Sequence, residues 1–529
     1  VFKSDPARFG DLVGGVATAP TAPFSADEEA SGIIDVSSIL GTGMYLAVIQ
    51  AHYTLADTEL VQGGQFLALY IPASLATTAI APGAGATVAG ATTGPSTAQS
   101  PYILPTATGA LTKSVISVGE SVNTKPNGVT PYRMVGIPDG LGAYDNSDGT
   151  FTLLMNHELG NTVGDVRAHQ SKGAFVSKWV IDKTTLAVQS GADLIQSVRL
   201  WDSASAAYVT GTTAFNRFCS ADLPPVTAFY NATTSMGTQN RIFMNGEESG
   251  SSGRAFAHVV TGTGAGVSYE LPRLGKFAWE NAVACPTAQA KTIVMGLDDS
   301  DRVGGASPSE VNIYVGTKTA TGTDIDKAGL TNGLLYGLKV TGKTVEDIAT
   351  TAPYGLGVAK GATVAFTLAQ YTTTNLLTDN GTALQAEAVT NGVTQFSRVE
   401  DGAWDPTLPN DFWFVTTDQF DQVKAGTGAQ VGRSRLWRMR FTNVATPEAG
   451  GTIAMMLDGT EAGQMYDNMT VDSMGRIILQ EDVGNQAHNG KTWAYSIATG
   501  ALTQVFKSDP ARFGDLVGGV ATAPTAPFS

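Results

Sequence analysis

Acidic side chains gather in six short segments of this sequence, where they stand beside Asn, Gly, Arg or His. The segments are NHE at 156–158, NGEES at 245–249, WEN at 279–281, LDDSD at 297–301, RVED at 398–401 and QEDVGN at 480–485. Carboxylates that converge repel one another unless a cation compensates, and oxygen-rich sites suit Ca²⁺ or related hard cations. Turn capping by Asp and Asn is an equal alternative for any single segment. Six such segments together favour a metal site.

Other residues with chemical potential are few. Cys219, in NRFCSADLP, is either a buried small side chain or a thiolate ligand for a softer metal such as iron. The only other cysteine is Cys285, so one disulfide is a further alternative. Five histidines, of which His157 and His488 are the most suggestive, argue against a His-built zinc centre. The sequence contains no HExxH and no GxSxG motif, which argues against zinc-protease and serine-hydrolase functions.

The overall charge is acidic. The 529 residues include 47 Asp and Glu against 32 Lys and Arg, and the isoelectric point is about 4.8. Surfaces for nucleic acid or anionic membranes need clustered Lys and Arg, so the chain is not expected to bind either. Residues 60–112 carry no charged side chain, but Pro and Gly interrupt them throughout, so they do not predict a transmembrane helix.

Short apolar runs must position the acidic segments. The runs recur from residue 151 to residue 497, are rich in β-branched residues, and are separated by Gly, Asn or Asp, which is typical of strands. Regular strands of this kind predict a sandwich, a barrel or a propeller. The hairpin VDSMGRIILQED at 471–482 is typical of a propeller blade. We therefore predict an all-β β-propeller of about six blades, with irregular loop insertions and minor helices.

The first 25 residues recur unchanged as residues 505–529, so the chain is circularly ordered. An engineered circular permutant, a tandem array, or a polymer whose units exchange this segment would each produce such a repeat, and all require a closed or repeating fold. We expect residues 1–74 to complete the propeller, 75–114 to form a low-complexity Ala/Thr/Gly/Pro linker, and 115–504 to form the propeller body. Residues 1–74 are too few to bury a core alone and should pack with the part of the chain after Val115.

Several motifs resemble those of secreted PhoX-type alkaline phosphatases and their uncharacterised bacterial relatives. They are GIPDGLGAY from 136, LLMNHELG from 153, NGEES from 245, WENAVA from 279, RVEDGAWDP from 398 and DNMTVDSMGRIILQEDVGN from 467. The resemblance covers roughly residues 115–490. It implies a six-bladed propeller-like fold that holds calcium and an oxo-bridged iron pair and hydrolyses phosphate monoesters. It also implies a secreted protein, extracellular or periplasmic.

The same resemblance assigns roles to individual residues. Cys219 stands where the family has an iron-binding cysteine, and Glu280 stands where it has the glutamate of a His-Glu pair, with Trp279 in place of that histidine. Arg398 would be the phosphate clamp. The metal ligands implied are Glu158, Cys219, Glu248, Glu280, Glu400 and Asp482. The segment after the cysteine, SADLPPVTAFYN, departs from the phosphatases, and this bears on the iron centre more than on the calcium sites.

Two functions follow from these observations. One is a secreted, metal-dependent phosphatase in which calcium and iron polarise the phosphoryl oxygens while Arg398 adds charge stabilisation. The other is a structural subunit of an extracellular filament or tandem array, with a degenerate phosphatase-like site. Its partners would be neighbouring copies of the same chain, joined head to tail when the repeated segment enters a neighbour's sheet. The two functions are compatible.

Overall fold

A computed structural model of the chain describes residues 28–75, 90–300, 309–346, 356–378, 381–417, 434–483 and 489–513. Beyond these it describes only the backbone of four short strands, namely β1 (Asp11–Val13), β2 (Val16–Thr18), β38 (Asp515–Val517) and β39 (Val520–Thr522). Strands make up most of the regular structure of the described chain, as the apolar runs predict. No helix among these residues has the length and apolar character needed to cross a membrane.

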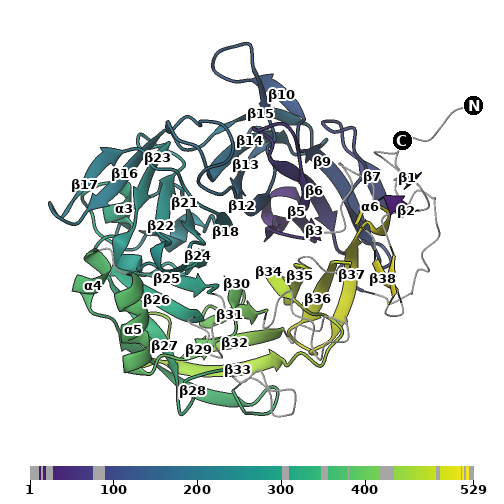
Figure 1. Cartoon of the computed structure of the whole chain (residues 1–529). Coiled ribbons are helices and arrows are strands. Elements are labelled where there is room, and N and C mark those ends of the chain that lie inside the picture. The colour runs from purple at the N-terminus through teal and green to yellow at the C-terminus, as the bar shows by residue number, and fades with distance from the viewer. Residues whose placement is uncertain are drawn as a thin grey trace, which may run out of the picture.

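Successive sheets surround a common middle, and this arrangement is a β-propeller (Figure 1). The first sheet contains β3 (Glu28–Glu29), β4 (Ile33–Asp35), β5 (Met44–Thr54), β6 (Gln62–Tyr70), β7 (Ala91–Thr93) and β9 (Leu111–Ser117). The second contains β12 (Pro138–Asp145), β13 (Thr150–His157), β14 (Phe175–Asp182) and β15 (Val188–Asp193). The third contains β16 (Ser197–Asp202), β17 (Ala207–Gly211), β18 (Phe218–Asp222), β21 (Ile242–Glu247), β22 (Ala255–Val259) and β23 (Val267–Glu270).

The rest of the ring is a ten-stranded sheet followed by a five-stranded one. The former joins β24 (Trp279–Ala284), β25 (Lys291–Asp298), β26 (Ser309–Thr317), β27 (Leu334–Val340), β28 (Thr363–Gln370), β29 (Gln395–Phe396), β30 (Val399–Trp404), β31 (Asp411–Thr416), β32 (Arg435–Phe441) and β33 (Gly451–Leu457). The latter joins β34 (Tyr466–Val471), β35 (Arg476–Glu481), β36 (Lys491–Ser496), β37 (Leu502–Ser508) and β8 (Ile103–Pro105). Because one sheet runs through ten strands, the number of blades stays a prediction.

Short hairpins and helices decorate the ring. The hairpins pair β10 (Ser121–Thr124) with β11 (Pro131–Arg133) and β19 (Tyr230–Asn231) with β20 (Met236–Gly237). The α-helices are α2 (Ser37–Leu40), α3 (Asp324–Lys327), α4 (Thr373–Leu377), α5 (Gly381–Asn391) and α6 (Pro510–Phe513). The 3₁₀ turns are η1 (Val226–Ala228), η2 (Gly250–Ser252), η3 (Pro272–Leu274) and η5 (Pro447–Ala449). These elements confirm the expectation of minor helices in an all-β protein.

Apolar side chains fill the space between neighbouring sheets. In the largest cluster, Ile293, Ile313, Phe396, Phe414 and Trp437 are all fully buried. Phe396 meets Phe414 and Trp437 edge to face. Burying each such side chain stabilises the fold by about 1.5–3 kcal/mol. Packing between sheets thus holds the ring together and leaves its middle to the inner strands.

The segment predicted as a linker, 75–114, contains strands among its described residues; residues 76–89 lie outside the described residues. It contributes β7, β8 and the start of β9. Tyr102 and Ile103 are buried. Small, uncharged residues can still pair their backbones at a sheet edge, where few large side chains are needed. Residues 65–70 pair with residues 111–117, since β6 lies beside β9.

The start of the second copy of the repeat, residues 505–513, lies within the fold. Its first residues form the end of β37, which pairs with β36 on one side and with β8 on the other. Val505, Phe506, Arg512 and Phe513 are all buried. Of the first copy, only β1 and β2 are described, and they pair in the same register as β38 and β39. Strand β8 comes from near the front of the chain, so its pairing with β37 closes the ring.

Two buried acids face each other where β25 ends and β26 begins. Asp298 and Glu310 are only 1% and 2% exposed. Gln385 Nε2 donates a 2.9 Å hydrogen bond to Glu310 Oε1. Burial raises the pKa of Glu310 to about 8, and burial together with the neighbouring Glu310 raises the pKa of Asp298. Glu310 therefore holds its proton at neutral pH.

A raised folded-state pKa has a defined consequence for stability. The favourable contribution is complete below the unfolded pKa of about 4.3 and is lost as the pH rises through about 8. We expect the free energy of unfolding to fall by about 3 kcal/mol between pH 6 and pH 9. The substitution Glu310→Gln should flatten this fall in denaturant titrations, whereas Glu448→Gln at an exposed position should not. An unchanged pH profile for Glu310→Gln would contradict the assignment.

Candidate metal centre

Five inner strands share the same local arrangement of residues at their start. The second residue of β12, β18, β24, β30 and β34 is an acid or the cysteine; these residues are Asp139, Cys219, Glu280, Glu400 and Asp467. At this point in every one of these strands the register with the neighbouring strand shifts. A β-bulge redirects the side chain that it contains. The bulges explain how residues far apart in sequence meet in the middle of the ring.

Backbone strain accompanies the bulges. Ile137, Arg217, Arg398 and Met465 each directly precede one of these strands, and their φ angles are 52°, 48°, 58° and 50°. A non-glycine residue in this left-handed region costs on the order of 1 kcal/mol. Four such residues at equivalent positions mark a turn that the fold maintains at the entrance to the inner strands.

A second layer of acids comes from the neighbouring strands. Glu158, Glu248 and Asp482 directly follow β13, β21 and β35, and Asp299 directly follows β25. Because neighbouring strands run in opposite directions, the end of the second strand lies beside the start of the first. Glu29, at the end of β3, is joined by an isolated bridge to Asp482.

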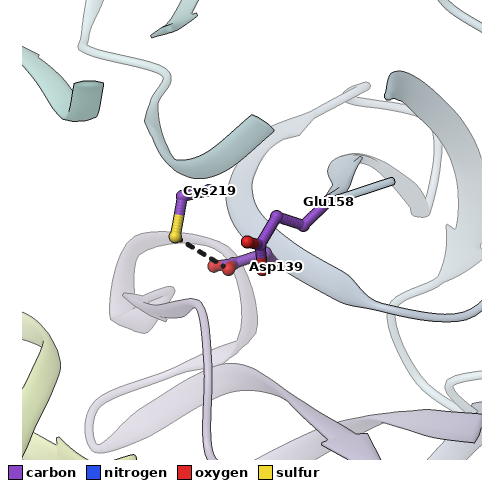
Figure 2. A group of neighbouring side chains, drawn as sticks. All are labelled: Asp139, Glu158 and Cys219. Atoms are coloured by element: carbon purple, nitrogen blue, oxygen red, sulfur yellow. Dashed lines mark hydrogen bonds between the residues drawn. The ribbon is translucent and has the colours of Figure 1, made fainter. Parts of the chain in front are cut away.

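These residues form four overlapping groups whose ligand atoms lie within 4.8 Å of one another. The groups are Asp139, Glu158 and Cys219; Cys219, Glu248 and Glu280; Glu280, Glu400 and Asp467; and Glu29, Asp467 and Asp482. We call them together the acidic cluster. Figure 2 shows the first group, in which the Cys219 Sγ donates a hydrogen bond of 3.3 Å to Asp139 Oδ2. Shared members connect all four groups.

In four inner strands a polar residue directly follows the acid or cysteine of the acidic cluster, and these polar residues fix the geometry of the cluster. Asp401 accepts hydrogen bonds from Asn281 Nδ2 at 2.7 Å and from the Met469 backbone at 3.0 Å. Ser220 Oγ donates to Asn468 Oδ1 at 2.9 Å. These bonds join β24, β30, β34 and β18 across the middle of the ring. The ligands in these inner strands are therefore held by rigid strands rather than by loops.

The fold brings together every metal ligand that the sequence predicts. Glu158, Cys219, Glu248, Glu280, Glu400 and Asp482 all belong to the acidic cluster, and their roles as ligands stay predictions. Arg398 lies at its edge. His157 lies elsewhere, bonded to Ser177 and stacked on Phe175, and His488 lies outside the described residues. Both cysteines are unpaired, which excludes a disulfide between them.

Three members of the acidic cluster were not singled out from the sequence, namely Glu29, Asp139 and Asp467. Asp139 and Asp467 do lie in the motifs GIPDGLGAY and DNMTVDSMGRIILQEDVGN. The sequence held a signal for Asp139 and Asp467, because each is the second residue of an inner strand, as Glu280 and Glu400 are. That equivalence depends on exact strand boundaries, which the sequence does not define.

The segment GLKVTGKT at 337–344 has the spacing of a phosphate loop, GxxxxGK[ST]. The structure argues against a nucleotide loop here. Gly337 and the residues up to Val340 lie in β27, which pairs with β26 and β28. A phosphate loop requires a loop between strand and helix, with backbone N–H groups turned to the ligand. Paired strand residues cannot provide it.

Burial and mutual repulsion raise the pKa values of four carboxyl groups in the acidic cluster. Burial is the main cause that raises the pKa values of Asp139, Glu280, Glu400 and Asp467, and neighbouring carboxylates raise them further. Burial also raises the pKa of the Cys219 thiol, with Asp139 as the next cause. A cation bound by these groups would relieve the repulsion.

Two arginines offset part of the negative charge. Arg398 makes a bidentate pair with Asp299 at 2.9 and 2.6 Å and lies 3.2 Å from Glu400. Arg217 bridges Glu158 and Glu248 at 2.7 and 2.6 Å. The Arg398 side chain is 16% exposed and that of Arg217 is 47% exposed. Arg217 is a further candidate that the sequence did not reveal.

The residues present fit metal ions. Asp139 Oδ1 and Glu280 Oε1 are buried without a hydrogen-bond partner, so each has a lone pair directed at no described donor. Within the described residues, the four groups contain carboxylates and one thiol and no histidine. Such a set suits hard cations such as Ca²⁺, and the thiol adds a place for a softer metal.

One comparison with known proteins, that with PhoX, supports the fold. No protein-family model matches the chain, and no curated protein matches its sequence. PhoX from Pseudomonas fluorescens, solved in complex with vanadate as a transition state analogue, is similar with a TM-score of 0.53 at 12% identity, over 77% of this chain and 86% of that chain. The β-propeller domain of the Trilobed protease from Pyrococcus furiosus matches with a TM-score of 0.31 at 7% identity, over 90% and 97%. The similarity to PhoX, at this identity, shows a shared propeller fold.

Removing one acid should distinguish two effects of the acidic cluster on stability, namely the electrostatic cost without metal and the stabilisation by bound calcium. With excess EDTA at mildly alkaline pH, Glu280→Gln should raise the free energy of unfolding by about 1–2 kcal/mol, because a buried Gln carries no charge and needs no proton to become neutral. With saturating calcium, the same variant should lose much of the stabilisation that calcium gives the wild type. Denaturant titrations in the two conditions measure both effects.

Asp411→Asn is the matched control for Glu280→Gln. Asp411 is a buried acid outside the acidic cluster and pairs with Arg440. Its loss should destabilise the protein in both conditions and leave the gain from calcium unchanged. Equal calcium stabilisation of the wild type and Glu280→Gln would show that Glu280 is not a ligand.

Proposed function

We propose that this protein is a metal-dependent hydrolase of phosphate esters that acts at the acidic cluster. The observation that carries the proposal is the convergence of buried, partly unpartnered carboxylates and Cys219 beside Arg398 on the inner strands of a propeller. The similarity to the PhoX fold and the motif resemblance support the same reaction class. Calcium is the expected cation, with iron at the thiol, and an extracellular or periplasmic location belongs to the same proposal.

Arg398 would bind the phosphoryl group. Its guanidinium is held by two hydrogen bonds to Asp299, which fix its plane and limit its motion. The strained turn around it is held as well, because the Ser397 backbone donates to Glu346 Oε2 and the Val399 backbone donates to Ser309 Oγ, both at 2.7 Å. A donor fixed in this way stabilises charge that develops on phosphoryl oxygens at little reorganisation cost.

The acidic cluster would hold the metal ions, through the six predicted ligands together with Glu29, Asp139 and Asp467. When bound, the metals would polarise the phosphoryl oxygens and activate the attacking oxygen. The chain's own contribution is position. Bulged strands and the bonds around Asp401 fix the oxygens, while burial keeps bulk water from competing for them. No side-chain nucleophile is needed.

Replacing Arg398 should reduce turnover without unfolding the protein. We expect phosphate release from a chromogenic monoester in the presence of calcium and iron, with kcat/KM lower by about 10²-fold in Arg398→Lys and about 10³-fold in Arg398→Ala. Arg440→Lys is the control, since Arg440 makes the same bidentate contact with Asp411 outside the acidic cluster. A fully metallated wild type without turnover would refute the proposed function.

The repeated segment favours a second role, in assembly. The copy at the end of the chain occupies its place in the closing sheet, where Val505 and Phe506 are fully buried. One propeller has one such place, so a second identical copy fits the same place only in another molecule. We propose head-to-tail association with neighbouring copies of this chain, a contact that propagates rather than closes.

The two copies offer a matched pair of substitutions. Phe506→Asp should destabilise the fold, because it places a charge in the buried closing sheet. Phe2→Asp should leave the fold intact and prevent association. Analytical ultracentrifugation of the wild type should show concentration-dependent oligomers, and electron microscopy should show fibres with a one-propeller repeat. A wild type that stays monomeric at all concentrations would exclude this role.

A further inference from the structure

A polar groove lies beside the acidic cluster. Its volume is about 500 Å³, and it is lined by residues from the loop after β13, the approach to β18, the turn after β21 and the start of α5. The lining includes Asn161, Asn216, Ser249, Ser251 and Thr382. Asn161, Ser251 and Thr382 are exposed, so the groove is open to solvent.

The groove and the acidic cluster share a wall. Asn216 directly precedes Arg217, and Ser249 directly follows Glu248. The two are tied together, since Asn216 Nδ2 donates to Ser249 Oγ at 2.7 Å and the Glu248 backbone donates to the Arg217 carbonyl at 2.9 Å. Arg217, which bridges Glu158 and Glu248, therefore stands where the groove meets the acidic cluster.

The groove surface can form many hydrogen bonds and has little apolar area to offer. Apart from one alanine and one glycine, its lining consists of hydroxyl, amide and charged side chains, and none of the described lining residues is aromatic. Arg254 is held by Glu247 at 2.7 and 2.8 Å, and Lys276 adds a second cation. An aromatic or alkyl group would find no partner for stacking or apolar contact here. A ligand rich in hydroxyl groups would find donors and acceptors.

We infer that this groove binds the alcohol portion of the phosphate ester and selects a polyol or a sugar. This inference rests on the proposed function. With the phosphoryl group at Arg398 and the acidic cluster, the leaving alcohol would extend past Arg217 into the groove. Specificity then comes from hydrogen bonds to hydroxyl groups, because a site built to bond a hydroxyl discriminates against an analogue that lacks it.

Paired substrates test the inference. Glucose 6-phosphate and hexyl phosphate both carry a primary phosphate ester, and only the former carries hydroxyl groups. We expect kcat/KM to be at least about 10-fold higher for glucose 6-phosphate. In the double variant Ser251→Ala/Thr382→Ala, whose exposed positions should tolerate alanine, this ratio should fall toward unity. Ser203→Ala, an exposed serine outside the groove, should leave the ratio unchanged.

A binding measurement separates the two proposals. Sorbitol, which carries no phosphate, should bind the wild type in saturation-transfer NMR and bind the double variant more weakly. Sorbitol binding without turnover of any ester would support the groove and refute the phosphatase. Turnover of both esters at equal kcat/KM, without sorbitol binding, would overturn the groove and leave the phosphatase standing. Neither binding nor turnover would overturn both.

Discussion

Like charges gathered out of water are the constraint on which this molecule depends. Eight carboxylates and one thiol of the described chain lie in overlapping groups, and two arginines stand beside them. Such a cluster is unfavourable unless protons or cations neutralise it. The stability of the surrounding sheets, with cores such as that around Phe414 and Trp437, allows the fold to tolerate it. Neutralisation by cations rather than protons would convert this cost into binding free energy.

The geometry comes from one backbone device used repeatedly. A left-handed residue, a bulge and an acid or cysteine recur at the start of inner strands, as in Arg398 followed by Val399 and Glu400. Two of the left-handed residues are the arginines, so the same strained turn that directs the ligands also places the cations that face them. Strain and repulsion are thus concentrated in the middle of the ring, while sheet packing supplies stability elsewhere.

Sequence patterns predict much of this arrangement. Strand periodicity indicates the all-β ring, and motif resemblance brings Glu158, Cys219, Glu248 and Glu280 to one place, where the structure also has them. Asp139, Asp467 and Arg217 are missed because their positions depend on bulges and strand starts, which periodicity does not resolve. The strands within 90–114 are missed for a related reason, since edge strands such as β8 rely on backbone pairing more than on apolar side chains.

The most direct test of the central claim is anomalous X-ray diffraction from crystals of the protein purified without chelators. We predict strong anomalous peaks within about 2.3–2.6 Å of carboxylate oxygens of Glu280, Glu400 and Asp467. Peak heights across absorption edges would identify each metal. Well-ordered carboxylates at these positions with no anomalous peak, in crystals grown with calcium and iron, would show that protons alone neutralise the acidic cluster and would contradict the metal centre.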